Sequence, residues 1–325
     1  MPDANSDLKP NISLLRERAE LLRELRTFFD GRGFLEVQPP CLSRDCIVDA
    51  YIDPLQIESR QFALADQTLP PTYFLQTSPE LAMKRMLAAG APSIYAITPV
   101  FRAGESGATH NVEFTMLEWY DVGANLESGV QLLCDLTTQI LSSDQCTVTT
   151  YRQAFRDYAS IDPIDASLEQ IQVLAADCDS TLAQSIGDDR DGLLDVLMSE
   201  KIQPSLQRPT IVTHYPISQA ALAKVSADDP SCAARFELFA YGVELANGYD
   251  ELLDAQELIV RTKTINQKRI ANGRRTLQLP QTLIDSMRSG LPQCAGVALG
   301  VDRLLMVRAG VNKIEQVIPF TSGRA

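Results

Sequence analysis

The chain has 325 residues, of which 45% are hydrophobic and 22% are charged, an ordinary composition for a globular protein with a large core in one domain or two. Its net charge of −13 argues against extensive contact with nucleic acid, which usually requires a basic surface. No apolar run approaches the roughly 18 residues of a membrane helix, and the polar start resembles neither a signal peptide nor a transit peptide.

The seven cysteines are scattered, odd in number and never form C-x-x-C. This pattern is typical of a reducing compartment without a disulfide framework, so we expect a cytoplasmic protein. A zinc site is not expected, because the chain has two histidines and no cysteine cluster. Carboxylates and phosphates would instead favour a hard cation such as Mg²⁺.

Short strands and long helices follow one another along the chain, after an expected disordered leader at 1–10. Hydrophobic spacing predicts helices at 13–29, 81–89, 126–141, 255–271, 282–288 and 301–309. Strands are predicted at 34–37, 51–57, 73–77, 94–98, 114–120, 210–214, 236–246 and 294–299. The acidic segment 144–206 is predicted to be a mostly helical insertion. This order indicates an α+β fold around a mainly antiparallel sheet flanked by helices.

The segment 101–120, FRAGESGATHNVEFTMLEWY, combines an arginine, a polar loop with two glycines, and a strand. Phe114, Met116, Glu118 and Tyr120 fall on one face of that strand, because successive side chains point to opposite faces. An aromatic ring, a carboxylate and a phenol together suit a ligand better than a core. The loop is predicted to wrap a nucleotide, with Arg102 aimed at a phosphate.

Two further segments carry candidate chemistry. Glu237 and Glu244 are an odd number of positions apart, so only a hairpin or bulge at 241–242 would bring both to one cation. Taken alone, that segment is better explained as a strand with solvent-facing acids. In GVALGVDRL, 296–304, a small-residue strand opens into a helix whose N-terminus attracts anions, and Arg303 adds a planar cation. A tightly packed strand–helix turn is an equally good interpretation.

Other features are less specific. Ser78 suits a helix N-cap and Pro79 the first helical position. His214 is expected to be structural, whereas His110 in the polar loop is compatible with either a structural or a functional role. A basic run is either a solvated helix face, which its own pattern favours, or a docking face for an acidic partner. Its members are Arg261, Lys263, Lys268, Arg269, Arg274 and Arg275.

Together these segments resemble the signature motifs of class II aminoacyl-tRNA synthetases, and in detail those of the lysyl subgroup. GFLEVQPP, 33–40, is similar to motif 1, which builds the dimer interface in that family. The segments 101–120 and 296–304 are similar to motifs 2 and 3. TSPE, 77–80, and ELANGYDEL, 244–252, are similar to the amino-acid pocket of the lysyl enzymes.

The resemblance covers nearly the whole chain from about residue 12. It implies a homodimeric catalytic domain over 11–325, with the helical segment 144–206 inserted in it. An anticodon-binding domain is not expected, because the N-terminal barrel of lysyl enzymes would need on the order of 100 further residues. This shortened form resembles a branch of the family that joins (R)-β-lysine to a lysine of elongation factor P.

We therefore expect ATP-dependent formation of a β-lysyl-adenylate, followed by transfer to elongation factor P. Binding of tRNA is not expected, and the negative charge fits the loss of an RNA-binding surface. Two alternatives stay open. One is a minimal lysyl-type synthetase that charges tRNA or another small acceptor. The other is a catalytically silent paralogue with a regulatory role.

Carried over position by position, the resemblance implies a role for each matching residue. Arg102 would act at the α-phosphate of ATP, and Phe114 and Arg303 would stack on opposite sides of adenine. The other nucleotide contacts would come from Ala103, Gly104, Asn111, Glu244, Leu245 and Gly300. Glu237 and Glu244 would hold Mg²⁺. The amino-acid site would comprise Ser78, Pro79, Glu80, Tyr120 and Glu251, since a substrate with two amines needs carboxylates and a phenol.

Three places depart from the lysyl pattern. Gly104 stands where lysyl enzymes carry a glutamate, and Glu105 follows one position later. Ala108 and Thr109 stand where relatives usually have arginine, which weakens the expected grip on the β- and γ-phosphates. Ala298 replaces a glycine of motif 3, and its methyl group would reshape the pocket floor for an amine on the β carbon.

Overall fold

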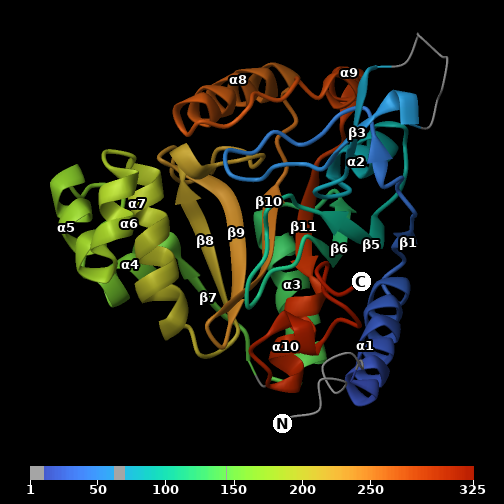
Figure 1. Ribbon diagram of the computed structural model, residues 1–325, viewed down its shortest axis with the longest axis horizontal. Coiled ribbons are helices and arrows are strands. Elements are labelled where there is room, and N and C mark those ends of the chain that lie inside the picture. The colour runs from blue at the N-terminus through green and yellow to red at the C-terminus, as the bar shows by residue number, and fades with distance from the viewer. Residues whose placement is uncertain (1–10, 62–69, 144) are drawn as a thin grey trace. The chain divides into compact units, whose positions relative to one another are not determined.

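The computed structural model describes residues 11–61, 70–143 and 145–325 (Figure 1). The expected leader at 1–10 lies outside the described residues. The chain divides into two compact units. Unit 1 comprises Met1–Gly123 and Leu253–Ala325, and unit 2 comprises Ala124–Leu252. Each unit is described by itself.

Unit 1 contains strands in the order β1-β5-β6-β11. Their bounds are Leu35–Glu36 for β1, Ile94–Phe101 for β5, Glu113–Val122 for β6 and Cys294–Gly300 for β11. Strand β1 runs parallel to β5, while β6 is antiparallel to both β5 and β11. Because β6 is hydrogen-bonded along both edges, the direction of each of its side chains is fixed. A smaller sheet has the order β2-β4-β3, with bounds Leu42–Ser43, Thr72–Leu75 and Gln56–Glu58.

The helices of unit 1 have the bounds Ile12–Asp30 for α1, Glu80–Ala88 for α2, Ala255–Ala271 for α8, Gln281–Gly290 for α9 and Val301–Ala309 for α10. They each bury one side, which is mainly apolar in α1, α9 and α10 but includes charged residues in α2 and α8. Helix α1 begins at a side-chain cap, since Asn11 Oδ1 accepts hydrogen bonds from the amides of Ser13 and Leu14 at 3.0 and 3.3 Å. Its Phe29 ring stacks on Tyr95 at 4.9 Å and lies 5.1 Å from Trp119. Trp119 is on the odd-numbered face of β6, so α1 covers the face opposite to Glu118.

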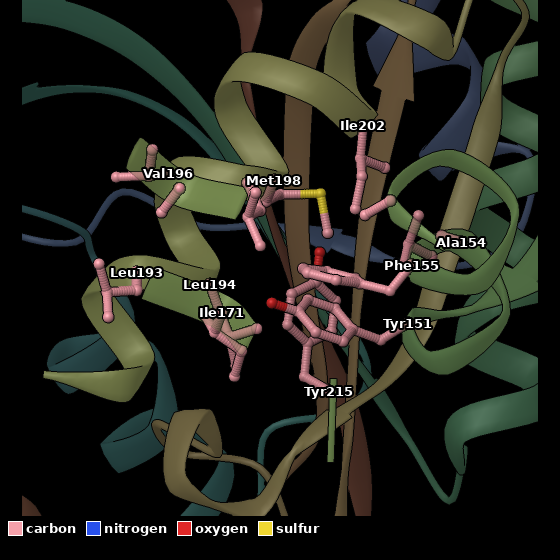
Figure 2. Close-up of a cluster of buried hydrophobic side chains, with 14 of the residues drawn as sticks. Tyr151, Ala154, Phe155, Ile171, Leu193, Leu194, Val196, Met198, Ile202 and Tyr215 are labelled. Carbon is pink, nitrogen blue, oxygen red and sulfur yellow. The ribbon is translucent and has the colours of Figure 1, made fainter. Parts of the chain in front are cut away.

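Unit 2 contains strands in the order β10-β9-β8-β7. The strands span Thr147–Thr150 (β7), Thr210–Pro216 (β8), Cys232–Ala240 (β9) and Val243–Asp250 (β10), and only β7 and β8 pair in parallel. The helices span Leu126–Leu141 (α3), Tyr151–Ala159 (α4), Leu168–Cys178 (α5), Ser180–Ile186 (α6) and Arg190–Leu197 (α7). Figure 2 shows the core of this unit, where Phe155, Ile171 and Leu194 gather around the rings of Tyr151 and Tyr215.

The predicted α+β class with a mainly antiparallel sheet is confirmed, and α3, α8 and α10 have the predicted bounds. The segment 144–206 is mostly helical where the structure describes it, but it opens with strand β7 at Thr147–Thr150. The prediction of one catalytic domain over 11–325 stays a prediction. The strand predicted at 51–57 is wrong except at its end, because the Ile52 carbonyl is bonded to a distant arginine and Asp53 makes only an isolated bridge to Ala103. The strand predicted at 236–246 is two strands, separated by a turn at Tyr241 and Gly242.

All seven cysteines are free thiols. In the described parts of the chain, no helix combines the length and the apolar character needed to cross a bilayer.

Candidate active site

One face of strand β6 carries the candidate site of unit 1. The register aligns Phe114, Met116, Glu118 and Tyr120 with alternate residues of β5 and β11, so the four side chains share one face as predicted. Phe114 is half-buried, and the other three are buried. Ala298 of β11 lies directly opposite Glu118, so its methyl group is a neighbour of that carboxylate.

The loop between β5 and β6 begins at Arg102. The Arg102 guanidinium lies 5.1 Å from the centre of the Phe114 ring, and its Nη1 lies 3.7 Å from Glu105 Oε1. Gly104 has a φ of +78°, which a glutamate would adopt only with strain, so the glycine suits this backbone. Glu105 therefore partly balances the charge of Arg102, and an incoming phosphate would compete with it.

A cluster of polar side chains lies at the other end of the same strand face. Glu118 Oε2 accepts a hydrogen bond from Ser78 Oγ at 2.5 Å, and Glu118 Oε1 accepts one from the Tyr120 hydroxyl at 2.7 Å. Lys84 Nζ lies 2.5 Å from Glu80 Oε1, one turn along α2, and 5.9 Å from the centre of the Tyr120 ring. We call these five residues the carboxylate cluster.

The helix start that carries this cluster is displaced by one residue from the prediction. Glu80 is the first residue of α2, and Pro79 takes the cap position. Ser78 Oγ still accepts a hydrogen bond from the Glu80 amide at 3.1 Å while it donates to Glu118. The serine thereby joins the N-terminus of α2 to strand β6.

Burial raises the pKa of Glu118 to about 7, and the neighbouring charge of Glu80 adds to this effect. The hydrogen bonds from Ser78 and Tyr120 and the charge of Lys84 oppose it. Two buried carboxylates and one buried ammonium leave net negative charge in this cluster when both carboxylates are ionised. Such a cluster suits a cationic amine, because the ligand's charge compensates carboxylates that burial has removed from water.

Motif 3 places Arg303 near the loop of motif 2. Strand β11 ends at Gly300, which is the cap residue of α10, and Arg303 lies in the first turn of that helix. Arg303 Nη2 lies 2.6 Å from His110 Nε2, and its Nε lies 3.4 Å from the carbonyl oxygen of Thr109. The two cations predicted for nucleotide binding, Arg102 and Arg303, are thus both anchored to the same loop.

A buried ion pair supports the start of α10. Asp302 is 1% exposed; its Oδ1 lies 2.5 Å from Arg18 Nη1, and its Oδ2 accepts from the Thr115 amide at 2.7 Å. Arg18 also donates to Thr115 Oγ1 at 2.6 Å. Helix α1, strand β6 and helix α10 therefore meet at three side chains, immediately beside Phe114 and Arg303.

A second arginine supports the start of the loop that follows Arg102, through the segment 49–53. Arg269 of α8 is buried and donates to the carbonyl oxygens of Asp49 and Ile52, at 2.7 and 3.1 Å, and to the carboxylate of Asp53. The Asp53 carbonyl accepts from the Ala103 amide at 2.8 Å. The basic run is therefore not one surface, because its Arg269 is part of the interior.

Asn111 is held by the end of the chain. Its Oδ1 accepts from the amide and the hydroxyl of Ser322, at 3.1 and 3.2 Å, and its Nδ2 donates to the Glu113 carbonyl at 2.7 Å. These contacts give Asn111 a structural task in the loop. Its contact with the nucleotide stays a prediction.

In unit 2, strands β9 and β10 form the hairpin that the two glutamates required. Tyr241 and Gly242 both have positive φ, at 53° and 75°, which is the geometry of a tight two-residue turn. Glu244 pairs with Phe239, which is two residues from Glu237, so Glu237 and Glu244 lie on the same face. A bulge then follows at Leu245. Solvent-facing acids do not describe this segment, because Glu237 is buried.

Glu237 is surrounded by donors. Its Oε1 lies 2.5 Å from Arg235 Nη2 and accepts from Asn247 Nδ2 at 3.0 Å, while its Oε2 accepts from the Tyr215 hydroxyl at 2.6 Å. Burial, followed by the charge of Glu244, raises the pKa of Glu237, and Arg235 opposes this shift. A carboxylate has about four acceptor positions, so at most one is left for a cation.

Glu237 and Glu244 can be compared with the ligands that Mg²⁺ requires. Magnesium in nucleotide enzymes takes one or two carboxylates and completes its octahedron with phosphates and water. Glu244 and one remaining position of Glu237, on one face of a hairpin, fit that requirement. Groups of three or more metal-binding side chains are absent from the described residues. Glu251, predicted for the amino-acid site, is buried and follows β10, with its backbone bridged to Ala223.

Sequence reasoning missed several residues that support the site. Glu118 was placed on the right face but was not assigned to the amino-acid site. Lys84 had a signal, since Glu80 and Lys84 have the i, i+4 spacing of a helical ion pair. The pairs Arg18–Asp302 and Arg269–Asp53 had none, because they join segments far apart in the chain.

Comparison with known families identifies this arrangement. The family model of class II tRNA synthetases (D, K and N) matches residues 8–324, and the chain belongs to this family. The chain is 40% identical over 324 residues to the elongation factor P–(R)-β-lysine ligase of Photorhabdus laumondii, which covers 99% of both chains. It is 39% identical over 321 residues to the protein of the same name from Salmonella paratyphi B, which covers 98% of both chains.

Proposed function

We propose that the chain is an ATP-dependent ligase that activates (R)-β-lysine and transfers it to a lysine side chain of elongation factor P. In the first step, a carboxylate oxygen of β-lysine attacks the α-phosphorus of ATP. The bond to the bridging oxygen of pyrophosphate breaks, and β-lysyl-adenylate forms. In the second step, the ε-amine of the acceptor lysine attacks the acyl carbon. An amide forms, and AMP and a proton leave.

The carboxylate cluster carries this proposal. Glu80 and Glu118 provide buried negative charge. Glu118 lies on the strand face whose other end bears Phe114 and, beside it, Arg102. From residue 114 to residue 120 a strand extends about 20 Å, enough to hold a nucleotide and an amino acid in sequence. Ser78, Pro79, Glu80 and Tyr120 are proposed to bind the amino acid. The names of the relatives support β-lysine as the substrate and elongation factor P as the acceptor.

At the nucleotide end, Arg102 is proposed to bind the α-phosphate and to stabilise the charge that develops during attack. Arg303 and Phe114 are proposed to hold adenine between them. Ala103, Gly104, Asn111 and Gly300 are proposed to line the nucleotide. In-line attack needs positioning and charge neutralisation rather than an enzyme nucleophile, and two planar cations supply both.

The residues of unit 2 are proposed to complete the chemistry. Glu244 and Leu245 would contact ATP, Glu251 would contact the amino acid, and Glu237 and Glu244 would hold Mg²⁺. When bound, that ion would neutralise phosphate charge. Glu244→Gln should therefore raise the Mg²⁺ concentration needed for half-maximal activity, whereas an unchanged Mg²⁺ requirement would remove Glu244 from this role.

The proposal extends to the assembly and setting of the protein. We propose a cytoplasmic homodimer that pairs through the motif 1 region and does not use tRNA. Leu35 on strand β1 supports the pairing surface, because 52% of it is exposed on a strand that ends the sheet order of unit 1. Light scattering should report a dimer for the native chain and a monomer for Leu35→Arg. If the native chain and Leu35→Arg have the same oligomeric state, this interface is ruled out.

The function is tested by pyrophosphate exchange followed by acceptor transfer. Exchange into ATP should depend on (R)-β-lysine and proceed less well with α-lysine. Purified elongation factor P should then gain the mass of one β-lysyl group, and a variant lacking its acceptor lysine should not. Transfer to tRNA alone would instead establish a minimal synthetase. No exchange with any lysine isomer would indicate a silent paralogue.

A further inference from the structure

His110 and Arg303 are in direct contact. Arg303 Nη2 can only donate, so His110 Nε2 at 2.6 Å must accept, and the ring must be neutral with its proton on Nδ1. This tautomer also fits the other nitrogen, since Nδ1 lies 3.2 Å from Thr109 Oγ1, which can accept. Both ring nitrogens therefore have partners of the right kind.

The loop around His110 is fixed by its backbone. The Gly107 amide donates to the His110 carbonyl at 3.1 Å, which closes a turn, and the Ile314 amide donates to the Ala108 carbonyl at 2.7 Å. The carbonyl of Thr109 accepts from Arg303 Nε at 3.4 Å. Two consecutive loop residues thus hold two nitrogens of one guanidinium, Nε and Nη2.

We infer that His110 is a positioning residue, which as a neutral acceptor orients the Arg303 guanidinium for the nucleotide. This inference rests on the proposed role of Arg303 in binding ATP. A free arginine side chain samples many rotamers, and fixing it before binding removes part of the entropy cost of association. Protonation of His110 would remove the acceptor and place two cations in contact, so Arg303 would be released.

The charges that face His110 favour its neutral form. Partial burial lowers the pKa of His110, and Arg303 of α10 lowers it further, as does Arg102 of the loop. Glu105 of the same loop opposes them. The pKa lies below the ordinary value of about 6.5, so the contact with Arg303 is intact at neutral pH and is lost only in mild acid.

The test compares three forms of the full chain by direct binding of a non-hydrolysable ATP analogue. His110→Gln keeps an acceptor oxygen that does not titrate, and His110→Ala removes the acceptor. At pH 7.5 the Gln variant should bind like the native chain. The Ala variant should bind about 10-fold more weakly, as expected for a lost hydrogen bond to a charged group. The KM for the amino acid should not change.

The pH dependence separates positioning from a merely structural role. The ratio of dissociation constants, native chain over His110→Gln, should be near one at neutral pH and rise steadily as the pH falls below about 6.5, toward about 10-fold once His110 is fully protonated. Protonation of the nucleotide cancels in this ratio. The chain has one other histidine, His214, and His214→Asn should leave the acid change intact. A ratio that stays constant with pH would overturn the inference.

A double-mutant cycle provides the second criterion. In an Arg303→Ala background, His110→Ala should cause no further loss of affinity, since the residue that His110 orients is gone. A full additional loss would mean that His110 contacts the nucleotide itself, which contradicts the inference. Because binding is measured without turnover, these results stand even if the proposed ligase activity fails. Circular dichroism of each variant confirms folding.

Discussion

Arg18 Nη1 and Asp302 Oδ1 lie 2.5 Å apart, although the two residues are separated by almost the whole chain. The pair joins α1 to the first turn of α10, one residue before Arg303. Asp302 is buried, and its second oxygen is already occupied by the Thr115 amide. Packing of helix α1 and positioning of Arg303, the residue proposed to bind the nucleotide, are therefore coupled.

Arg18→Met should lower the free energy of unfolding by about 3 kcal/mol, because it leaves the Asp302 carboxylate buried without its cation. It should also raise the KM for ATP, since Arg303 loses its support. Urea denaturation and pyrophosphate exchange measure the two effects. Arg26→Met is the control on the same helix; its ion pair with Glu36 is exposed and should contribute less than about 1 kcal/mol. Equal losses in both variants would contradict this account.

The kcat/KM for β-lysine should depend on pH because of Glu118. A carboxyl group whose pKa is raised to about 7 carries a proton below that pH, and the protonated form cannot attract a cationic amine. One unit below the pKa only about a tenth is ionised, so kcat/KM for β-lysine should fall about 10-fold from pH 8 to pH 6.

Glu118→Gln should have a low kcat/KM for β-lysine that no longer changes over this range, with little effect on the KM for ATP. Glu113→Gln is the matched control, because Glu113 is exposed on the opposite face of the same strand. If the acid decrease persists in Glu118→Gln, another group is responsible.

Arg102 should be essential for activation. Arg102→Ala should lower kcat/KM of exchange by about 100- to 1,000-fold, the usual loss for a donor that stabilises transition-state charge. Arg102→Lys should rescue little, because an ammonium lacks the planar pair of donors. Glu105→Gln should instead lower the KM for ATP slightly, since it removes a carboxylate 3.7 Å from Arg102. A higher KM for ATP in Glu105→Gln would instead show that Glu105 contacts the nucleotide.

Arg269→Met should destabilise the fold by about 2 kcal/mol, because two carbonyls lose their charged donor. Asp53 contributes less, since it is 39% exposed and keeps Arg274 as a partner. Lys263→Met, on an exposed position of the same helix, should change stability by less than about 0.5 kcal/mol. Thermal unfolding measures both variants. If only Lys263→Met impaired transfer to elongation factor P, the exposed part of the basic run would be a docking face.

The sequence predicted elements whose signals are local. Helix α3 was located from its apolar spacing, and the shared face of β6 from simple alternation. The failures have distant causes. The strand expected at 51–57 is held by Arg269, more than 200 positions away in sequence.

The same distinction applies to the candidate site. The i, i+4 pair of Glu80 and Lys84 could have been read from the chain. The hydrogen bond from Ser78 to Glu118 depends on how α2 meets β6, which no local pattern specifies. A hairpin or bulge at Tyr241 and Gly242 was foreseen as a possibility, but the segment alone favoured a strand with solvent-facing acids. No local pattern marks the turn, since Tyr is an unusual residue at a positive φ.

Strand β6 is bonded along both edges, and a slip of one residue would turn Glu118 and Tyr120 to the opposite face. The separation between the nucleotide end and the amino-acid end is therefore constant for every substrate. A new substrate preference would then come from exchanged side chains around the strand face, and not from a shift of the strand itself. Ala298 lies opposite Glu118, and we expect one methyl group more or less at this position to change the preference between isomeric amino acids.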